Sequence, residues 1–266
     1  MEFINTELPD IIELKDIDQS YDGGKTFVLK NFNLLIEDKP NRGQFVALLG
    51  PSGCGKSTIL KYICSLQKPT SGIVNFKGRP ITKKDTVGMV FQQYSSLPWK
   101  SVIENVALGL QFRGINKKDR TDQAMEAIKI VGLEGHENKY AKYGILSGGQ
   151  LQRVAIARNL LTNPEILLMD EPFGALDIHT RLKMQDMLLG IFSQIQPTIV
   201  MVTHDISEAV YLSDDIYIMS ANPGVIVHHI PVSCMLSRSP GIKRSKQFTD
   251  IVYDIEDKMM ALKNNK

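Results

Sequence analysis

The chain alternates between short, continuously apolar runs and segments in which apolar residues recur with helical spacing. The strongest apolar runs lie at residues 45–49, 87–91, 166–169 and 198–202. Runs of this length predict strands, and a strand that is apolar on both faces is typical of a buried parallel sheet. Helices are predicted at residues 57–66, 102–112, 117–131, 151–161 and 178–194. The pattern therefore predicts an α/β fold.

Further segments surround this core. Residues 11–17 and 28–36 read as strands on either side of a glycine-containing turn, which predicts an antiparallel β layer before the core. The helical pattern at about residues 100–160 predicts an insert between core strands. We expect one domain over residues 1–230 and a C-terminal helical tail over residues 231–266.

The amino-acid composition and the net charge argue against several classes of protein. The 266 residues are 43% hydrophobic, and 31 basic residues against 29 acidic ones leave a net charge of +2, which is not the footprint of a nucleic-acid binder. No apolar run is long enough to cross a membrane, and residues 1–5 lack the features of a signal peptide. The 3 cysteines form no C-x-x-C pair, which argues against a disulfide framework and a structural zinc site. We therefore expect a protein of the reducing cytosol with no nucleic-acid partner.

The first group of candidate functional residues lies in a loop between an apolar run and a predicted helix. The loop reads Gly50, Pro51, Ser52, Gly53, Cys54, Gly55, Lys56, Ser57 and Thr58. This spacing is the Walker A pattern of phosphate-binding loops. The glycines let the backbone wrap round an anion and turn its amides towards the phosphates, Lys56 adds a positive charge, and Ser57 adds a hydroxyl suited to Mg²⁺. Because Cys54 lies at a helix N-terminus, we also expect its thiolate form to be favoured.

A second group of polar residues follows the ends of predicted strands. Asp170 and Glu171 follow the apolar run at residues 166–169 in a Walker B arrangement, where Asp170 can meet the Mg²⁺ of the phosphate loop. Since strand side chains alternate in direction, we expect Glu171 to point away from the metal and to address the attacking water. Gln92 follows another strand and is placed to reach a metal or water. The alternative is a strand that merely ends in a solvated acidic turn.

For each of the other candidate functional residues, the sequence leaves two interpretations open. His204 follows a third strand and is interpreted as a γ-phosphate contact, although a lone histidine is more often structural. Tyr21 either stacks on a base or is a core or hairpin tyrosine, and Trp99 either contacts a partner or folds back on its own domain. A predicted helix opens with Ser147, Gly148, Gly149 and Gln150. This start is either a second anion site or only a helix cap.

In this order along the chain, the motifs resemble those of the ATP-binding cassette (ABC) ATPases over nearly all of residues 10–230. The matching positions are Lys56, Gln92, residues 146–150, Asp170, Glu171, residues 175–177 and His204. The resemblance implies the P-loop NTPase fold of the ABC ATPases, with a mixed core sheet, an antiparallel β subdomain and a helical insert. It also implies an ATPase that uses ATP and Mg²⁺.

The resemblance further implies a role for each motif. Tyr21 is the implied aromatic residue that stacks on adenine, His204 the H-switch, and Asp177 a residue of the D-loop. Residues 147–150 are the implied signature, which closes on the γ-phosphate held by Lys56 of a second copy. A head-to-tail homodimer is therefore implied. Gln92 is the Q-loop glutamine, and the implied oxygen ligands of Mg²⁺ are Ser57, Gln92 and Asp170.

Within the family, residues 97–106 and 220–224 look like the ATPase subunits of nitrate, sulfonate and taurine importers. This implies uptake of a small anionic solute through a separate membrane permease, which contacts the loop from Gln92 to Trp99. An extracytoplasmic substrate-binding protein is implied in the same system, with the chain at the cytoplasmic face of the cell membrane. Two alternatives stay open. One is a soluble ABC protein that acts on ribosomes or DNA, against which the single cassette and the balanced charge argue, and the other is export instead of import.

Overall fold

The computed structural model describes residues 10–39, 42–82, 84–93, 95–236, 239 and 241–264. Residues 1–5, where the sequence predicts no signal peptide, lie outside the described residues. The chain divides into two compact units. The first unit combines Met1–Asp85 with Val202–Lys266, and the second is Thr86–Met201.

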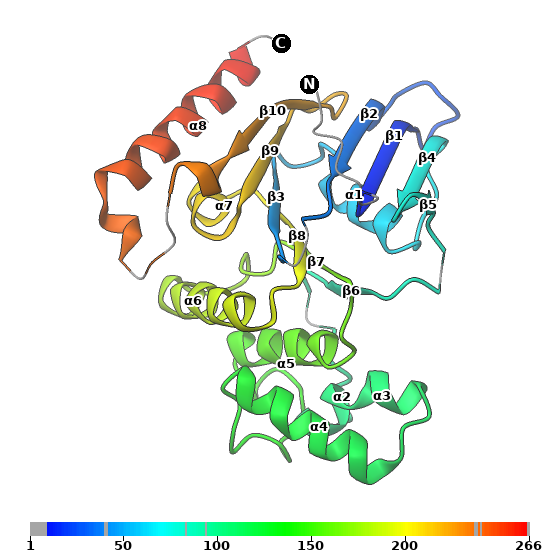
Figure 1. The fold of residues 1–266 in the computed structure, drawn as a ribbon, viewed down its shortest axis with the longest axis vertical. Helices are drawn as coiled ribbons and strands as arrows, with labels where there is room; N and C mark the ends of the chain where they lie inside the picture. The colour runs from blue at the N-terminus through cyan, green and yellow to red at the C-terminus, as the bar shows by residue number, and fades with distance from the viewer. Residues whose placement is uncertain are drawn as a thin grey trace. The chain divides into compact units, whose positions relative to one another are not determined.

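The first unit contains a sheet with the strand order β2-β1-β4-β5. Its strands are β1 (Ile12–Gln19), β2 (Leu29–Ile36), β4 (Ser71–Phe76) and β5 (Arg79–Pro80). Neighbouring strands are antiparallel, and Leu14 of β1 lies opposite both Leu34 of β2 and Val74 of β4. This sheet is the antiparallel β layer that the sequence predicts (Figure 1).

A second group of strands in the first unit follows the order β10-β9-β3. β3 (Phe45–Leu49) is parallel to β9 (Asp215–Met219), and β9 is antiparallel to β10 (Ile226–Pro231), so the group is mixed. Every residue of β3 is buried, which explains why its sequence is continuously apolar. β3 leads into the phosphate loop and then into α1 (Lys56–Ile63).

The remaining helices of the first unit include the predicted tail. α7 (Ile206–Leu212) packs against α8 (Lys246–Asn264), and two 3₁₀ turns precede α8 in the described residues, η1 (Val232–Cys234) and η2 (Ile242–Arg244). Phe248 and Ile255 on α8 are buried, whereas Tyr253 is exposed. The helix is therefore amphipathic, as its sequence predicts.

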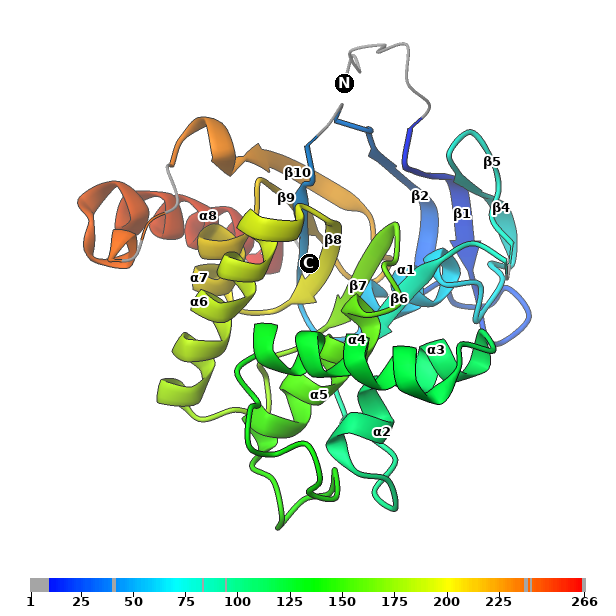
Figure 2. The ribbon, with the colours of Figure 1, turned by 60° about the horizontal axis from the view of Figure 1, so that its bottom comes forward.

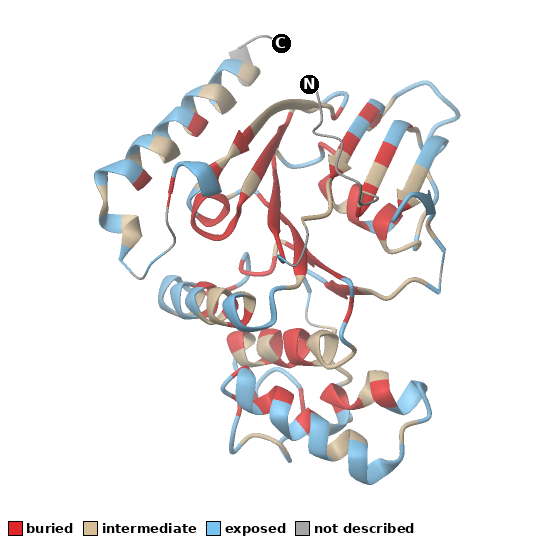
Figure 3. Ribbon diagram, viewed as in Figure 1, coloured by how far each residue is buried: buried red, intermediate tan, exposed pale blue. Residues whose placement is uncertain are grey.

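In the second unit, strands follow the order β8-β7-β6. β6 (Val87–Val90) pairs in parallel with β7 (Ile166–Asp170), and β7 is buried throughout. β8 (Thr198–Thr203) begins in this unit, and its last residues, Val202 and Thr203, belong to the first. Figure 3 shows β3, β7 and β9 as buried strands within their own units.

The helices of the second unit are α2 (Val102–Val106), α3 (Leu108–Phe112), α4 (Lys117–Ile130), α5 (Gly148–Leu160) and α6 (Ile178–Ile195). α5 packs against α2 and α4, which gives the helical insert of the sequence prediction (Figure 2). The prediction of one continuous helix over residues 102–112 was wrong. The chain is interrupted at Ala107, whose ψ of −7° departs from the helical value and separates α2 from α3. Among the described residues, no helix combines the length and the apolar character needed to cross a lipid bilayer.

Candidate active site

The phosphate loop connects β3 to α1 in the first unit. Its lysine is folded into the loop, because Lys56 Nζ donates hydrogen bonds to the carbonyl oxygens of Gly50 at 2.8 Å and of Pro51 at 2.9 Å. Gly53 and Gly55 have φ values of 80° and 98°, which only glycine adopts readily. The loop is therefore wound round the ammonium group, and a glycine-rich turn of this kind can direct its amides towards an anion.

The structure corrects the sequence prediction that the thiolate form of Cys54 is favoured. Its side chain is fully buried, and burial raises the pKa of the thiol above its ordinary value despite the nearby charge of Lys56. The expected preference for the thiolate was therefore wrong. The position at a helix N-terminus does not decide the matter, because the side chain points into the unit and loses its hydration.

A limited treatment of the nucleotide-free protein with N-ethylmaleimide is accordingly expected to modify Cys234 first and Cys54 last. Cys234 is exposed and Cys64 is partly exposed, while Cys54 is enclosed and has a raised pKa. Peptide mass spectrometry of a time course gives the order of modification. Early labelling of Cys54 would mean that the phosphate loop opens far enough to release this side chain.

Tyr21 is part of an ordered loop and not of a core. Its ring is 65% exposed, and its hydroxyl accepts a hydrogen bond from Gln67 Nε2 at 3.1 Å. The loop is held by Asp22, which accepts hydrogen bonds from the side chain and backbone of Thr26 and from Ser20, and these lower the pKa of Asp22 to about 2. The core interpretation of Tyr21 was wrong, whereas Tyr21 does lie in the hairpin connection between β1 and β2, and its accessible ring suits stacking on a base.

His204 follows β8 directly and is exposed. The residues around it form a compact hydrogen-bonded turn. Thr203 Oγ1 donates to Glu208 Oε2 at 2.8 Å and accepts from the backbone of Asp205, and Asp205 caps α7 by accepting from the Glu208 amide at 3.0 Å. Glu208 is 5% exposed and was missed by the sequence analysis, although Asp205-x-x-Glu208 has the spacing of a helix cap. The turn thus fixes the backbone that carries the imidazole.

The two carboxylates lie at the end of β7 in the second unit. Asp170 is the last residue of the strand and is 9% exposed. Glu171 leaves the strand with a φ of 43°, and its Oε2 accepts a hydrogen bond from Gln92 Nε2 at 3.1 Å. Strand alternation was therefore the wrong reason for the direction of Glu171. Its side chain is turned by a left-handed backbone conformation, which costs about 1–3 kcal/mol for a non-glycine residue and is common at functional sites.

The residues at the start of α5 have the hydrogen bonds of a helix cap. Ser147 accepts from the Gln150 amide, and Gln150 Oε1 accepts from the Ser147 amide, which makes a complete capping box. A Cβ on Gly149 would lie 2.5 Å from a methyl carbon of Thr180, so glycine is required where α5 meets the start of α6. Asp177 caps α6 at that place, and its hydrogen bonds from Thr180 lower its pKa. The signature and the D-loop residue therefore lie on packed helix ends.

A turn at residues 97–101 of the second unit projects Trp99, which is 68% exposed. Asn105, which is fully buried, holds this turn: it accepts from the Leu97 amide at 2.7 Å and donates to the carbonyl oxygens of Leu97, Lys100 and Ser101. The turn is therefore rigid, and Trp99 does not fold back on its own domain. The sequence analysis missed Asn105, a polar residue among the apolar positions of α2.

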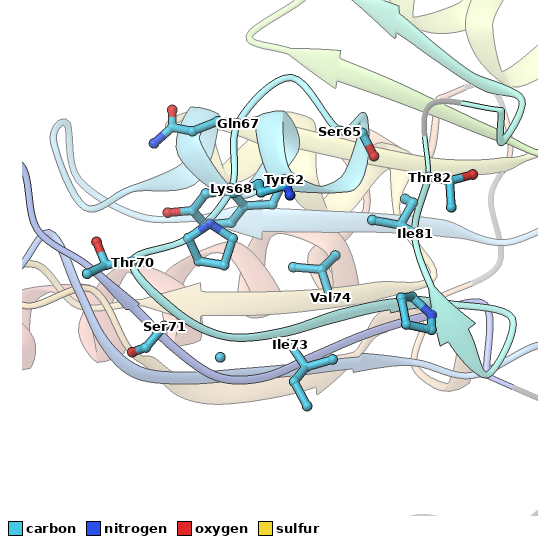
Figure 4. Close-up of a pocket in the computed structure, with 13 residues that line it drawn as sticks. Tyr62, Ser65, Gln67, Lys68, Thr70, Ser71, Ile73, Val74, Ile81 and Thr82 are labelled. Atoms are coloured by element: carbon cyan, nitrogen blue, oxygen red, sulfur yellow. The ribbon is translucent and has the colours of Figure 1, made fainter.

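A cavity of about 570 Å³ lies elsewhere in the first unit, between the end of α1 and β4. Figure 4 shows Tyr62, Gln67, Ile73 and Val74 around it. None of the residues that line it belongs to the predicted site. The candidate chemistry therefore rests on loops at strand ends and not on this cavity.

Comparison with known proteins decides the family. Residues 29–174 match the family model described as ABC transporter. The chain belongs to the ABC transporter family. Among curated members of the ABC transporter family, it is 42% identical to the nitrate import ATP-binding protein NrtD of Synechocystis sp., over 89% of this chain and 90% of that protein. It is 45% identical to the aliphatic sulfonates import ATP-binding protein SsuB of Bacillus cereus, over 86% of each chain.

The solved structures agree with this assignment. The dimeric ATP-binding cassette MJ0796, in a post-hydrolysis state bound to ADP and Pi, has a TM-score of 0.71 and 35% identity, over 83% of this chain and 98% of that one. The predicted family and ABC ATPase fold are therefore confirmed. As a member of the ABC transporter family, the chain binds ATP and hydrolyses it. The assignments of individual residues stay predictions.

Proposed function

We propose that the chain is the ATP-hydrolysing subunit of an importer and drives the uptake of a small anion, such as nitrate or a sulfonate, through a separate membrane permease. The names of the Synechocystis and Bacillus relatives support this direction of transport and this class of solute. Taurine belongs to the same class because it is itself a sulfonate. The chain acts as a homodimer at the cytoplasmic face of the membrane, and a binding protein on the outer side delivers the solute.

The observation that carries the proposal is the turn at residues 97–101. Asn105 fixes its backbone with hydrogen bonds from a fully buried position, while Trp99 remains 68% exposed. A rigidly presented aromatic side chain is typical of the centre of a protein interface. We expect a cytoplasmic helix of the permease to dock on this turn, next to the loop that carries Gln92.

The chain's own residues supply the groups that an ATPase requires. Lys56 and the amides of the phosphate loop bind the β- and γ-phosphates, Tyr21 stacks on adenine, and His204 contacts the γ-phosphate. The exposed Ser147, with its neighbours Gly148, Gly149 and Gln150, completes the site of a second copy. The dimeric state of the solved cassette supports this sharing of sites between two chains.

The residues also fit a magnesium ion. The proposed ligands are the Ser57 hydroxyl, the Asp170 carboxylate and the amide oxygen of Gln92, which are the hard oxygen donors that Mg²⁺ prefers. Gln92 donates to Glu171 through Nε2, which leaves its Oε1 as an acceptor. When bound, the ion neutralises negative charge on the phosphates. Glu171 takes a proton from the water that attacks the γ-phosphorus, and the bond to the bridging oxygen of ADP breaks.

The proposal is tested by affinity purification of tagged Glu171→Gln protein from its native cells in the presence of Mg²⁺ and ATP. A polytopic membrane protein in the eluate is the expected result. The solute is then identified by the genes that accompany the gene for this permease and by uptake assays. A set of ribosomal or DNA-associated partners would overturn the transport function while leaving the ATPase activity in place.

In the same experiment, Trp99→Ala is expected to reduce recovery of the permease about tenfold or more, the effect of removing an aromatic hot spot. Tyr253→Ala on α8 is the matched control, because Tyr253 is also an exposed aromatic residue, at 59%. Quantitative mass spectrometry of both eluates measures the effect. Equal recovery with Trp99→Ala and the control would exclude the turn as the docking site.

A further inference from the structure

The turn between β9 and β10, residues 220–224, is closed by its own hydrogen bonds and is linked through Gly224 to the segment that precedes β2. The Ser220 amide donates to the Val225 carbonyl oxygen at 2.9 Å, and Ser220 Oγ donates to the Pro223 carbonyl oxygen at 3.2 Å. At the other end, the Gly224 amide donates to the Val28 carbonyl oxygen at 2.8 Å. The resemblance of these residues to importer ATPases leaves their physical role open.

Gly224 lies directly against the backbone of the phosphate loop. A Cβ at this position would be 2.0 Å from the carbonyl oxygen of Cys54 and 2.9 Å from a methyl carbon of Leu29. Gly224 does not have a positive φ, so a left-handed conformation is not the reason for glycine there. The close approach of the Cys54 carbonyl leaves no space for a Cβ at this position.

This contact sets the orientation of one peptide group in the loop. In a trans peptide the C=O and the following N–H point in opposite directions, and the group is planar. Because the Cys54 carbonyl faces Gly224, the Gly55 N–H points away from the 220–224 turn. Leu29 packs beside this contact, since the same methyl carbon that would meet a Cβ on Gly224 would lie 2.6 Å from a Cβ on Gly55. Gly224 and Leu29 thus pack against the Cys54–Gly55 peptide and restrict its movement.

We propose that Gly224 is a positioning residue for nucleotide binding, which keeps the Gly55 amide turned towards the phosphates of ATP. The inference rests on the proposed role of the phosphate loop. Without the close approach of Gly224, the Cys54–Gly55 peptide must move or rotate, and one charge-assisted hydrogen bond to the phosphates is lost. Gly224 packs on the side of the Cys54 carbonyl, opposite the Gly55 amide, so it acts through Gly55 and not on the nucleotide itself.

The test is ADP binding by Gly224→Ala protein, compared with Gly190→Ala as a control. A Cβ on Gly190, in α6, would meet nothing within 4 Å. We expect Gly224→Ala to weaken ADP binding about tenfold, the effect of one lost hydrogen bond to a charged group, and Gly190→Ala to bind as the wild type does. Calorimetric titration of folded, monodisperse protein gives the Kd.

A second readout separates positioning from general stability. ADP raises the Tm of the wild type through binding, so a merely structural defect lowers the Tm but leaves this shift unchanged, whereas a positioning defect reduces the shift. Wild-type affinity in folded Gly224→Ala protein would overturn the inference. Failure of the wild type to bind ADP would instead overturn the proposed role of the loop.

If Gly224→Ala protein does not fold, the Ser220→Ala variant provides a second test of the inference. This variant removes only the hydrogen bond from Ser220 Oγ to the Pro223 carbonyl, which stiffens the turn. A loss of about two- to fivefold in ADP affinity is expected, in line with one neutral hydrogen bond. Unchanged affinity in this variant would overturn the inference.

Discussion

Replacing Glu171 with glutamine is expected to lower the rate of ATP hydrolysis by about 10²–10⁴-fold, the contribution of a general base. The substitution keeps the size of the side chain and removes the carboxylate that accepts the proton of the attacking water. An amide oxygen still accepts the hydrogen bond that Gln92 Nε2 donates to Glu171 Oε2 at 3.1 Å, so the surrounding loop is preserved. ATP binding is expected to remain, and the ATP-bound dimer to accumulate.

Steady-state phosphate release measures the rate, and size-exclusion chromatography with and without ATP measures the dimer. Glu134→Gln is a suitable control, because Glu134 is an exposed glutamate of the same unit. Hydrolysis by Glu171→Gln protein at nearly the wild-type rate would refute the assignment of Glu171 as the base. Another group would then have to activate the water.

Lys56→Ala is expected to raise the Kd for ATP about 100-fold and to abolish measurable turnover. Two effects combine in this variant. It removes a charge that binds the phosphates, worth about 1.5–3 kcal/mol per hydrogen bond. It also removes the bonds from Nζ to the carbonyl oxygens of Gly50 and Pro51, which brace the loop. Lys56 is only 5% exposed, so alanine also leaves a void inside the loop.

Titration with a fluorescent ATP analogue measures this loss of affinity. Lys61→Ala serves as the control, because Lys61 is an exposed lysine on the same helix, α1. Circular dichroism shows whether each variant is folded. Unchanged affinity in folded Lys56→Ala protein would contradict the phosphate-binding role of this lysine.

Local patterns predicted most of the framework. The phosphate loop lies between β3 and α1 as expected, because the apolar run, the glycine spacing and the helix start are all short-range signals. The capping box of Ser147 and Gln150 is equally local, and one of the two sequence interpretations anticipated it. The same kind of signal was present but not used at Asp205 and Glu208, which cap α7.

Tertiary contacts overruled local rules at two positions of the site. The helix N-terminus predicted a reactive Cys54, but the packed interior of the unit buries the thiol and raises its pKa. Strand alternation predicted the direction of Glu171, but the chain leaves β7 through a left-handed conformation and brings the carboxylate to Gln92. Both errors arose because a local rule describes neither the burial of a side chain by the rest of the unit nor the direction of a residue beyond the end of its regular element.

The sequence by itself determined the family, most of the strands and helices in their order, and which residues are candidates for binding phosphate. These follow from spacing and residue chemistry, which a linear pattern contains. Only the tertiary structure decided that Asn105 presents Trp99, that Glu208 braces the turn at His204, and that Gly224 lies behind Cys54. The physical reason is that these roles depend on buried hydrogen bonds and close packing, whose partners are chosen by the folded chain and not by the neighbouring residues alone.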